Sequence, residues 1–168
     1  QAVLNLVHEV QPDFVVPEVE MVAVSALKQI EEEGNAVVVP TARACEVTQD
    51  RASMRAAAES LGLPGSAYKF AESEEELAAA CEELGYPCIV KPDIATSGRG
   101  HMMVRDAADA PEAWTAVHRI VGDHHRLVAE RFVDFDYEAT ILAVRSIDPE
   151  TGKLATWFSE PIGHRHAN

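Results

Sequence analysis

The segment from Cys88 to Val104 is the part of the sequence that most restricts the possible folds of this chain. Cys88 to Val90 is a short apolar run that predicts a buried strand, and Lys91 stands at the end of that run. Met102 to Val104 predicts a second strand after a loop rich in small residues. We therefore expect Lys91 to lie at the start of a loop that joins two strands.

The loop from Thr96 to His101 has residues suited to binding phosphate. Gly98 and Gly100 bracket Arg99, so backbone N–H groups can approach an anion closely while the guanidinium adds charged donors. The pattern is neither a Walker loop nor a dinucleotide-binding fingerprint, because a strand rather than a helix follows and the spacing differs. Taken alone, a plain hairpin loop with glycine in its turn explains these residues at least as well.

The charge balance restricts the kinds of partner. The 168 residues include 14 Lys and Arg against 28 Asp and Glu, a formal net charge of −14. This balance argues against nucleic acid as the main partner and against an anionic membrane surface. An anionic ligand would need a local positive pocket, so the few well-placed cations are informative.

The cysteines and the first residues bear on localisation. Cys45, Cys81 and Cys88 are odd in number and lack metal-ligand spacing, so we expect free thiols in a reducing compartment and a cytoplasmic protein. No apolar run approaches the roughly 20 residues of a membrane span. Gln1 to Val10 lacks the features of a signal peptide and has the helical spacing of a helix whose start is missing.

Two regions of different organisation follow. Phe14–Pro17 and Ala36–Val39 predict strands, and Met21–Glu32 between them predicts a helix. Strand, helix and strand within about 26 residues indicate a βαβ unit, part of a doubly wound domain whose first strands would precede Gln1.

The second region predicts an α+β arrangement with an antiparallel sheet. Helices are expected from a cap at Thr48 or Asp50 to about Leu61, from Ser73 to Leu84, and from about Asp109 onward. Besides the two strands around the loop, strands are expected at Tyr68–Ala71, Leu127–Glu130, Asp136–Val144 and Leu154–Phe158, with a turn at Asp148–Gly152.

An acidic stretch follows Glu130. If the chain is extended there, Asp134, Asp136 and Glu138 lie on one face of a strand. Carboxylates suit ribose hydroxyls or an adenine amino group because they accept hydrogen bonds from both. A solvent-exposed acidic edge strand explains the same alternation.

Taken together, these segments resemble the ATP-grasp superfamily, and within it the family of formate-dependent phosphoribosylglycinamide formyltransferases of purine synthesis. The motifs that carry the resemblance are Pro17-Glu18-Val19-Glu20, Gly85-Tyr86-Pro87-Cys88-Ile89-Val90-Lys91-Pro92, Ser97-Gly98-Arg99-Gly100, Asp134-Phe135-Asp136-Tyr137-Glu138 and Gly163-His164-Arg165. The resemblance implies an α/β protein in which residues 1–47 are the C-terminal part of a doubly wound pre-ATP-grasp domain. Residues 48–168 would begin the ATP-grasp domain with its α+β lid.

The resemblance also implies a role for particular residues. Arg51 and Lys91 would contact the phosphates of ATP, and Glu138 would hold the ribose. Glu18, at the carboxyl end of a parallel strand, would bind glycinamide ribonucleotide. The flap over the triphosphate would consist of Thr96, Ser97, Gly98, Arg99, Gly100 and His101, and the adenine hinge of Glu130, Arg131, Phe132 and Val133.

Some positions depart from the family pattern or have less certain roles. Arg99 stands where the family has lysine, which keeps the charge but changes its geometry, and Ala95 and Thr96 replace serines. His164 and Arg165 could meet the transferring phosphate or formate, or could form a structural turn.

The implied enzyme uses ATP, Mg²⁺, formate and glycinamide ribonucleotide, and is a homodimer. Its magnesium ligands would lie beyond residue 168, so we expect no metal site in this piece and no activity from it alone. Two alternatives remain: another ATP-grasp enzyme, such as the one that carboxylates aminoimidazole ribonucleotide, or a nucleotide-binding or oligomerisation module without catalysis.

Overall fold

A computed structural model describes residues 1–18, 22–94 and 99–164 of the chain. The chain divides into two compact units, residues 1–132 and residues 133–168. The first unit contains two hydrophobic cores, and the second consists of strands. Within the described residues, no helix has the length and apolar character needed to cross a bilayer.

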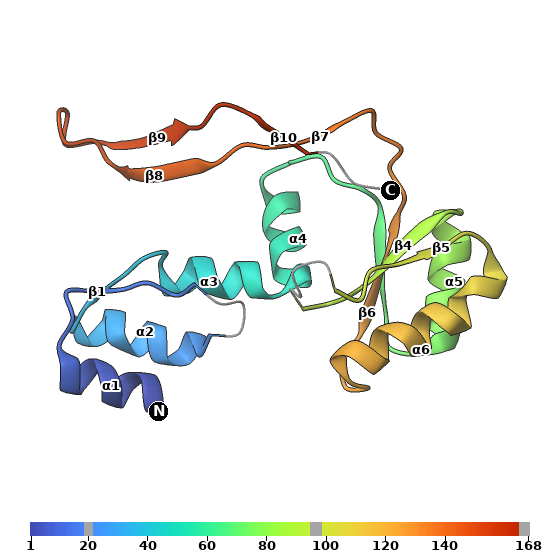
Figure 1. Ribbon diagram of the computed structural model, residues 1–168, viewed down its shortest axis with the longest axis horizontal. Helices are drawn as coiled ribbons and strands as arrows, with labels where there is room; N and C mark the ends of the chain where they lie inside the picture. Colours follow the sequence, from blue (N-terminus) through green and yellow to red (C-terminus); the bar gives the residue numbers. More distant parts are fainter. Residues whose placement is uncertain (19–21, 95–98, 165–168) are drawn as a thin grey trace. The chain divides into compact units, whose positions relative to one another are not determined.

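The first core is built by the amino-terminal helices and a pair of short strands (Figure 1). Strand β1 (Phe14–Val15) pairs in parallel with β2 (Val37–Val38), and α2 (Val24–Glu33) connects them, which confirms the predicted βαβ unit. Helix α1 (Ala2–Val10) confirms the helical spacing at the start of the chain. The buried side chains that join these elements include Leu4, Val7, Leu27, Ile30 and Val38.

One helix of this region was missed in the sequence. Helix α3 (Ala42–Gln49) begins at Thr41, whose hydroxyl accepts a hydrogen bond from the backbone N–H of Ala44 at 3.2 Å. Only Ala42 and Cys45 of this helix are buried. Two small buried residues give little apolar periodicity, so the helix depends on its cap and its contact with α2.

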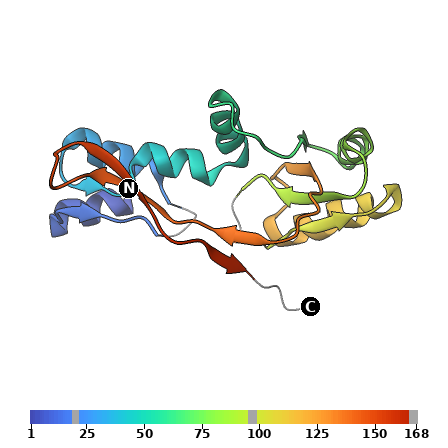
Figure 2. The same cartoon turned by 90° about the horizontal axis from the view of Figure 1, so that it is seen from above.

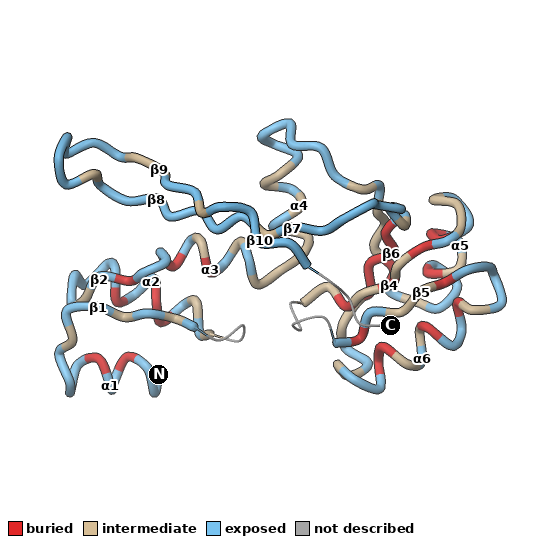
Figure 3. The backbone as a smooth tube through the Cα atoms, turned by 45° about the horizontal axis from the view of Figure 1, so that its top comes forward, coloured by how far each residue is buried: buried red, intermediate tan, exposed pale blue. Residues whose placement is uncertain are grey.

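The second core lies on one face of a four-stranded antiparallel sheet, as predicted. The strands run in the order β3 (Tyr68–Ala71), β6 (Leu127–Arg131), β4 (Cys88–Pro92) and β5 (Met102–Val104). Alternate residues of these strands, among them Cys88, Val90, Leu127, Ala129 and Val104, are fully buried against α5 (Glu74–Leu84) and α6 (Ala110–Val121). Figure 3 shows these buried residues concentrated in β4, β6, α5 and α6.

The helices that cover the sheet begin where the sequence predicts. The Ser73 hydroxyl accepts a hydrogen bond from the N–H of Glu76 at 3.1 Å, which caps α5. Helix α6 has proline in its first turn and is preceded by a short 3-10 turn at Ala107–Asp109. Both helices therefore owe their starts to local signals that can be read from sequence.

The opposite face of the sheet presents both charged and apolar side chains. Tyr68 and Ile89 both lie directly opposite Glu130, and Phe70 and Lys91 both lie opposite Val128. Residues directly opposite in an antiparallel pair share a face, so all of these point away from the second core. The side chains of α4 (Arg51–Ser60) reach this same face.

The second unit corrects one prediction. The segment expected as a single strand at Asp136–Val144 forms two strands with different partners: β7 (Glu138–Thr140) pairs with β10 (Ile162–His164), and β8 (Ala143–Ile147) pairs with β9 (Leu154–Phe158). Figure 2 shows the β8–β9 hairpin as a two-stranded ribbon in orange and red.

The break between β7 and β8 has its cause in the segment that pairs with them, between β9 and β10. Pro161 lies between β9 and β10 and has no N–H to donate to a ladder. The hydroxyl of Ser159 accepts from the N–H of Leu142 at 3.1 Å, and the two ladders on either side differ by one residue in register. The predicted acidic face is also wrong, because Asp134 and Asp136 precede β7 and only Glu138 belongs to a strand.

Candidate functional site

The site begins with the cap of α4. The Asp50 carboxylate accepts hydrogen bonds from the N–H groups of Ala52 at 3.3 Å and Ser53 at 2.8 Å, which confirms the predicted Asp50 cap. Burial raises the pKa of the Asp50 carboxyl, but the hydrogen bonds from Ser53 and Ala52 bring this pKa below its ordinary value. The charged cap therefore starts α4 at Arg51.

Arg51 is attached to the end of β4 at two points. Its backbone N–H donates to the carbonyl of Asp93 at 2.9 Å, and its Nε donates to the carbonyl of Pro92 at 2.9 Å. A terminal nitrogen of its guanidinium lies 3.3 Å from Nε2 of His101. These contacts join Arg51, the residues after Lys91 and the end of the predicted flap.

Lys91 points away from the second core and pairs with Glu130. The distance from Lys91 Nζ to Glu130 Oε2 is 2.8 Å, and the side chain of Glu130 is only 9% exposed. Burial raises the pKa of the Glu130 carboxyl, but the hydrogen bonds and charges of Lys91 and Arg55 lower it below its ordinary value. Glu130 is therefore a buried carboxylate held in its charged form.

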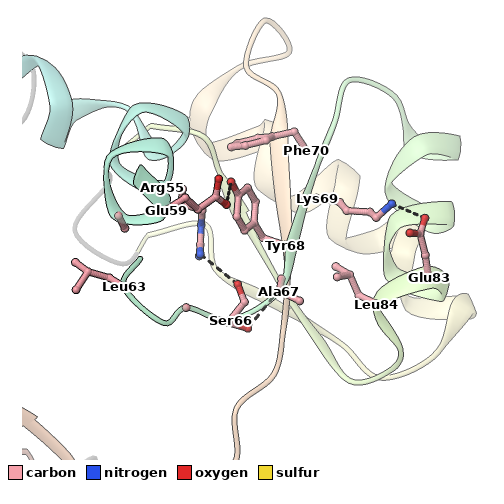
Figure 4. A pocket seen from close by; sticks show the side chains of 12 residues that line it. Arg55, Glu59, Leu63, Ser66, Ala67, Tyr68, Lys69, Phe70, Glu83 and Leu84 are labelled. Carbon is pink, nitrogen blue, oxygen red and sulfur yellow. Dashed lines mark hydrogen bonds and ion pairs between the residues drawn. The ribbon is translucent and has the colours of Figure 1, made fainter. Parts of the chain in front are cut away.

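Arg55 is a residue of this cluster that the sequence analysis missed. It forms an ion pair with Oε1 of Glu130, and its guanidinium carbon lies 4.4 Å from the centre of the Tyr68 ring. Figure 4 shows Arg55 and Glu59 of α4 directed toward Tyr68, beside a cavity of about 660 Å³ lined by α4, β3 and α5. The spacing of Arg51 and Arg55 at i and i+4 on one helix was the signal that could have revealed it.

The described end of the flap is held by a glycine. Gly100 is buried with φ of 76°, a conformation that favours glycine, and a Cβ there would lie 3.6 Å from both Pro92 and Val117. Burial together with Lys91 and Arg51 lowers the pKa of His101, which keeps that imidazole neutral at pH 7. Arg99 is described and exposed, whereas Thr96, Ser97 and Gly98 lie outside the described residues.

A second missed cation lies beside this cluster. Arg126 places its guanidinium carbon 4.4 Å from the centre of the Phe70 ring, and its Nε donates to Oδ2 of Asp93 at 3.2 Å. Asp93 in turn supplies the carbonyl that holds the N–H of Arg51. Arg126 therefore supports the placement of Arg51.

The predicted hinge lies at the point where the chain leaves the sheet. The N–H of Arg131 donates to the carbonyl of Ala67 at 2.9 Å, and the N–H of Phe132 donates to the carbonyl of Pro87 at 3.1 Å. Val133 begins the second unit and is 54% exposed. These contacts fix the backbone immediately after Glu130.

The remaining predicted residues lie elsewhere. In the second unit, Glu138 and His164 are directly opposite each other in the β7–β10 pair, and His164 Nε2 lies 2.7 Å from the Thr140 hydroxyl. Arg165 lies outside the described residues. Glu18 follows β1 and is exposed.

The first unit thus brings together Arg51, Lys91, His101 and Glu130 of the predicted set, with Arg55 in addition. Lys91 and Arg55 pair with the Glu130 carboxylate, and Arg51 lies beside His101, so the three cations of this cluster are suited to an anion such as a polyphosphate. Among the described residues, no group of three His, Cys, Asp or Glu side chains could hold a metal ion.

Comparisons with known proteins identify a family for the chain. Residues 56–168 match the ATP-grasp domain. Over 166 residues the chain is 51% identical to a formate-dependent phosphoribosylglycinamide formyltransferase of Corynebacterium efficiens, which covers 98% of this chain and 41% of that protein.

The solved structures that resemble the chain include the following two. Glycinamide-RNase-transformylase T from Mycobacterium tuberculosis has a TM-score of 0.74 at 32% identity, over 99% of this chain and 41% of that one. An ADP complex of N5-carboxyaminoimidazole ribonucleotide synthetase has a TM-score of 0.78 at 25% identity, over 98% and 41%. The chain spans about 41% of the length of the curated formyltransferase named above.

Proposed function

The chain belongs to the ATP-grasp family, and from that premise we propose that it is part of an enzyme that uses ATP and formate to formylate glycinamide ribonucleotide. The 51% identity to a formyltransferase of that name supports this substrate set over the alternatives. The products would be formylglycinamide ribonucleotide, ADP and phosphate. The cluster around Lys91 is the observation in the structure that supports an ATP site.

The phosphates of ATP would be held by the cations of the first unit. Lys91 and Arg51 supply fixed positive charge, and both are already oriented, by Glu130 and by the carbonyl of Pro92 respectively. Preorganised cations stabilise a transferring phosphoryl group without having to rearrange during the reaction. The loop from Thr96 to His101 would cover the triphosphate, with its far end anchored by buried Gly100.

The nucleoside would be read by the hinge and by Glu138. The carboxylate of Glu130 already binds Lys91 and Arg55, which leaves adenine recognition mainly to the backbone of residues 131–133. Glu138 would accept hydrogen bonds from the ribose hydroxyls. In this arrangement residues 48–168 are the start of the ATP-grasp domain with its lid, and residues 1–47 are the end of the substrate-binding domain.

The chemistry requires activation of formate. A carboxylate oxygen is a poor leaving group, and the phosphoryl group that ATP supplies makes it a good one. The amine of glycinamide ribonucleotide then attacks the formyl carbon and phosphate departs. Glu18, after a parallel strand, would contact glycinamide ribonucleotide, and His164 with Arg165 remain candidates near the formate. We further propose a cytoplasmic homodimer whose Mg²⁺ ligands lie in another part of the full-length protein.

The deciding experiment measures ADP release by the full-length enzyme with formate and glycinamide ribonucleotide each omitted in turn. We expect turnover only when both are present. ADP release that depends on bicarbonate instead of formate would favour an aminoimidazole ribonucleotide carboxylase. We include this alternative because the chain resembles the structure of N5-carboxyaminoimidazole ribonucleotide synthetase. ATP binding without any turnover would favour a non-catalytic nucleotide-binding module.

Lys91 provides a residue-level test. We expect Lys91→Ala in the full-length enzyme to weaken ATP binding by about 2 kcal/mol, or roughly 30-fold, because a charged hydrogen bond to phosphate is lost. The measurement is the Kd of ATP by titration calorimetry. Lys153→Ala removes the same charge from an exposed turn and serves as the control. Equal ATP affinity in the two variants would remove Lys91 from the site.

A further inference from the structure

The carboxylate of Glu130 is shared between two cations that come from different elements. Oε2 lies 2.8 Å from Nζ of Lys91 on the neighbouring strand β4, and Oε1 forms an ion pair with Arg55 of helix α4. The side chain of Glu130 is 9% exposed, so water has little access to either oxygen. Each oxygen therefore has one charged partner.

Arg55 is held in this position from three sides. Its side chain is 20% exposed, its guanidinium stacks on Tyr68, and one terminal nitrogen lies 3.4 Å from the carbonyl of Ser66. The hydroxyl of Tyr68 donates to Glu59 at 2.7 Å, one helical turn beyond Arg55 on α4 (Figure 4). Arg55 lies on the same helix as Arg51, so a single rigid element presents both guanidinium groups.

We propose that Arg55 is a positioning residue for the ATP site: by occupying one oxygen of Glu130, it fixes the carboxylate and leaves the positive charge of Lys91 available to the phosphates. This inference rests on the ATP site proposed above. Arg55 itself need not touch ATP, and its effect passes through Glu130.

The charge balance gives the physical reason. Lys91 and Glu130 alone form a neutral pair, which attracts a polyphosphate weakly. With Arg55 present, the charge of Glu130 is compensated by Arg55 as well, so an anion bound at Lys91 does not have to compete with an uncompensated buried carboxylate. Without Arg55, both oxygens of Glu130 would be free to draw the ammonium toward the sheet and to repel phosphate.

The test is a double-mutant cycle in the full-length enzyme, with the Kd of Mg²⁺–ATP measured by calorimetry for the wild type, Arg55→Met, Glu130→Gln and the double variant. We expect Arg55→Met to weaken ATP binding about tenfold, and the same change in the Glu130→Gln background to weaken it less than about twofold, because the partner charge is gone. Arg119→Met on the exposed side of α6 is the matched control for net charge.

Two further readouts separate positioning from support of the fold. Arg55→Lys keeps the charge but loses the planar group that stacks on Tyr68, so we expect its ATP affinity to lie between those of the wild type and Arg55→Met. The KM for glycinamide ribonucleotide is expected to stay unchanged in Arg55→Met, whereas a general structural defect would raise the KM of every substrate. The lysine variant also tests the inference if the methionine variant is poorly folded.

Several results would overturn the inference. One is ATP affinity of Arg55→Met within twofold of the wild type. Another is an equal loss in both Glu130 backgrounds, which would indicate direct contact of Arg55 with ATP. A wild-type enzyme that fails to bind ATP at all would instead contradict the proposed function, so the two failures are distinguishable.

Discussion

At the scale of single residues, Glu130 brings a buried carboxylate between Lys91 and Arg55. Burial raises the pKa of this carboxyl, and the two cations more than offset that effect, so its pKa lies below the ordinary value of 4.5. A carboxyl whose pKa is lower in the folded state stabilises the fold at pH values above its unfolded pKa. That stability is lost as pH falls through the folded pKa.

The lowered pKa of Glu130 predicts how the free energy of unfolding depends on pH. We expect the free energy of unfolding of the full-length protein to fall more steeply below about pH 4.5 than that of Glu130→Gln, which cannot titrate there. Urea unfolding from pH 3.5 to 7 would measure the difference, and Glu160→Gln at an exposed site is the control. Parallel curves for the wild type and Glu130→Gln would show that Glu130 does not stabilise the fold through its charge.

At the scale of elements, α5 depends on its buried face. Leu77 is fully buried in the second core between α5 and the sheet. We expect Leu77→Ala to lower the free energy of unfolding by about 3 kcal/mol, since the change removes apolar contacts and leaves a cavity.

The control for this change is Leu61→Ala at the end of α4. Leu61 is 73% exposed, so the same substitution is expected to cost less than about 0.5 kcal/mol. Denaturant unfolding of the two full-length variants gives both values. Similar losses in the two would mean that the second core does not limit the stability of the protein.

The helices and strands also show which local sequence signals are enough to predict an element. Helices α4 and α5 follow from the caps at Asp50 and Ser73, and the sheet strands follow from short apolar runs. Helix α3 lacked such a pattern, and the split between β7 and β8 depends on Pro161, which lies in a different strand region. The break between β7 and β8 could have been predicted only by pairing residues 138–147 correctly with residues 154–164.

At the scale of the molecule, the proposed site residues fall in both units. Lys91 and its partners belong to the first unit, whereas Glu138 and His164 belong to the second. Strands β8 and β9 expose large apolar side chains, among them Val144 at 61% and Phe158 at 70%. Such surfaces are commonly covered in a complete protein.

We therefore expect a protein of these 168 residues alone to show no formate-dependent ADP release. The reason is the proposal made above, that the Mg²⁺ ligands lie in another part of the full-length protein. The assay compares this protein with the full-length enzyme at equal concentration. Turnover by the shorter protein that requires both formate and glycinamide ribonucleotide would contradict the prediction.

The family, the antiparallel sheet and the position of Lys91 at the end of a strand could all be predicted before the structure, because motifs, apolar runs and helix caps are written along the chain. Only the tertiary structure revealed that Lys91 shares Glu130 with Arg55, since Lys91 and Glu130 are 39 positions apart in sequence and meet only when β4 pairs with β6. Spacing along the chain cannot specify which charges meet across a sheet, and that pairing sets the net charge at the proposed phosphate site.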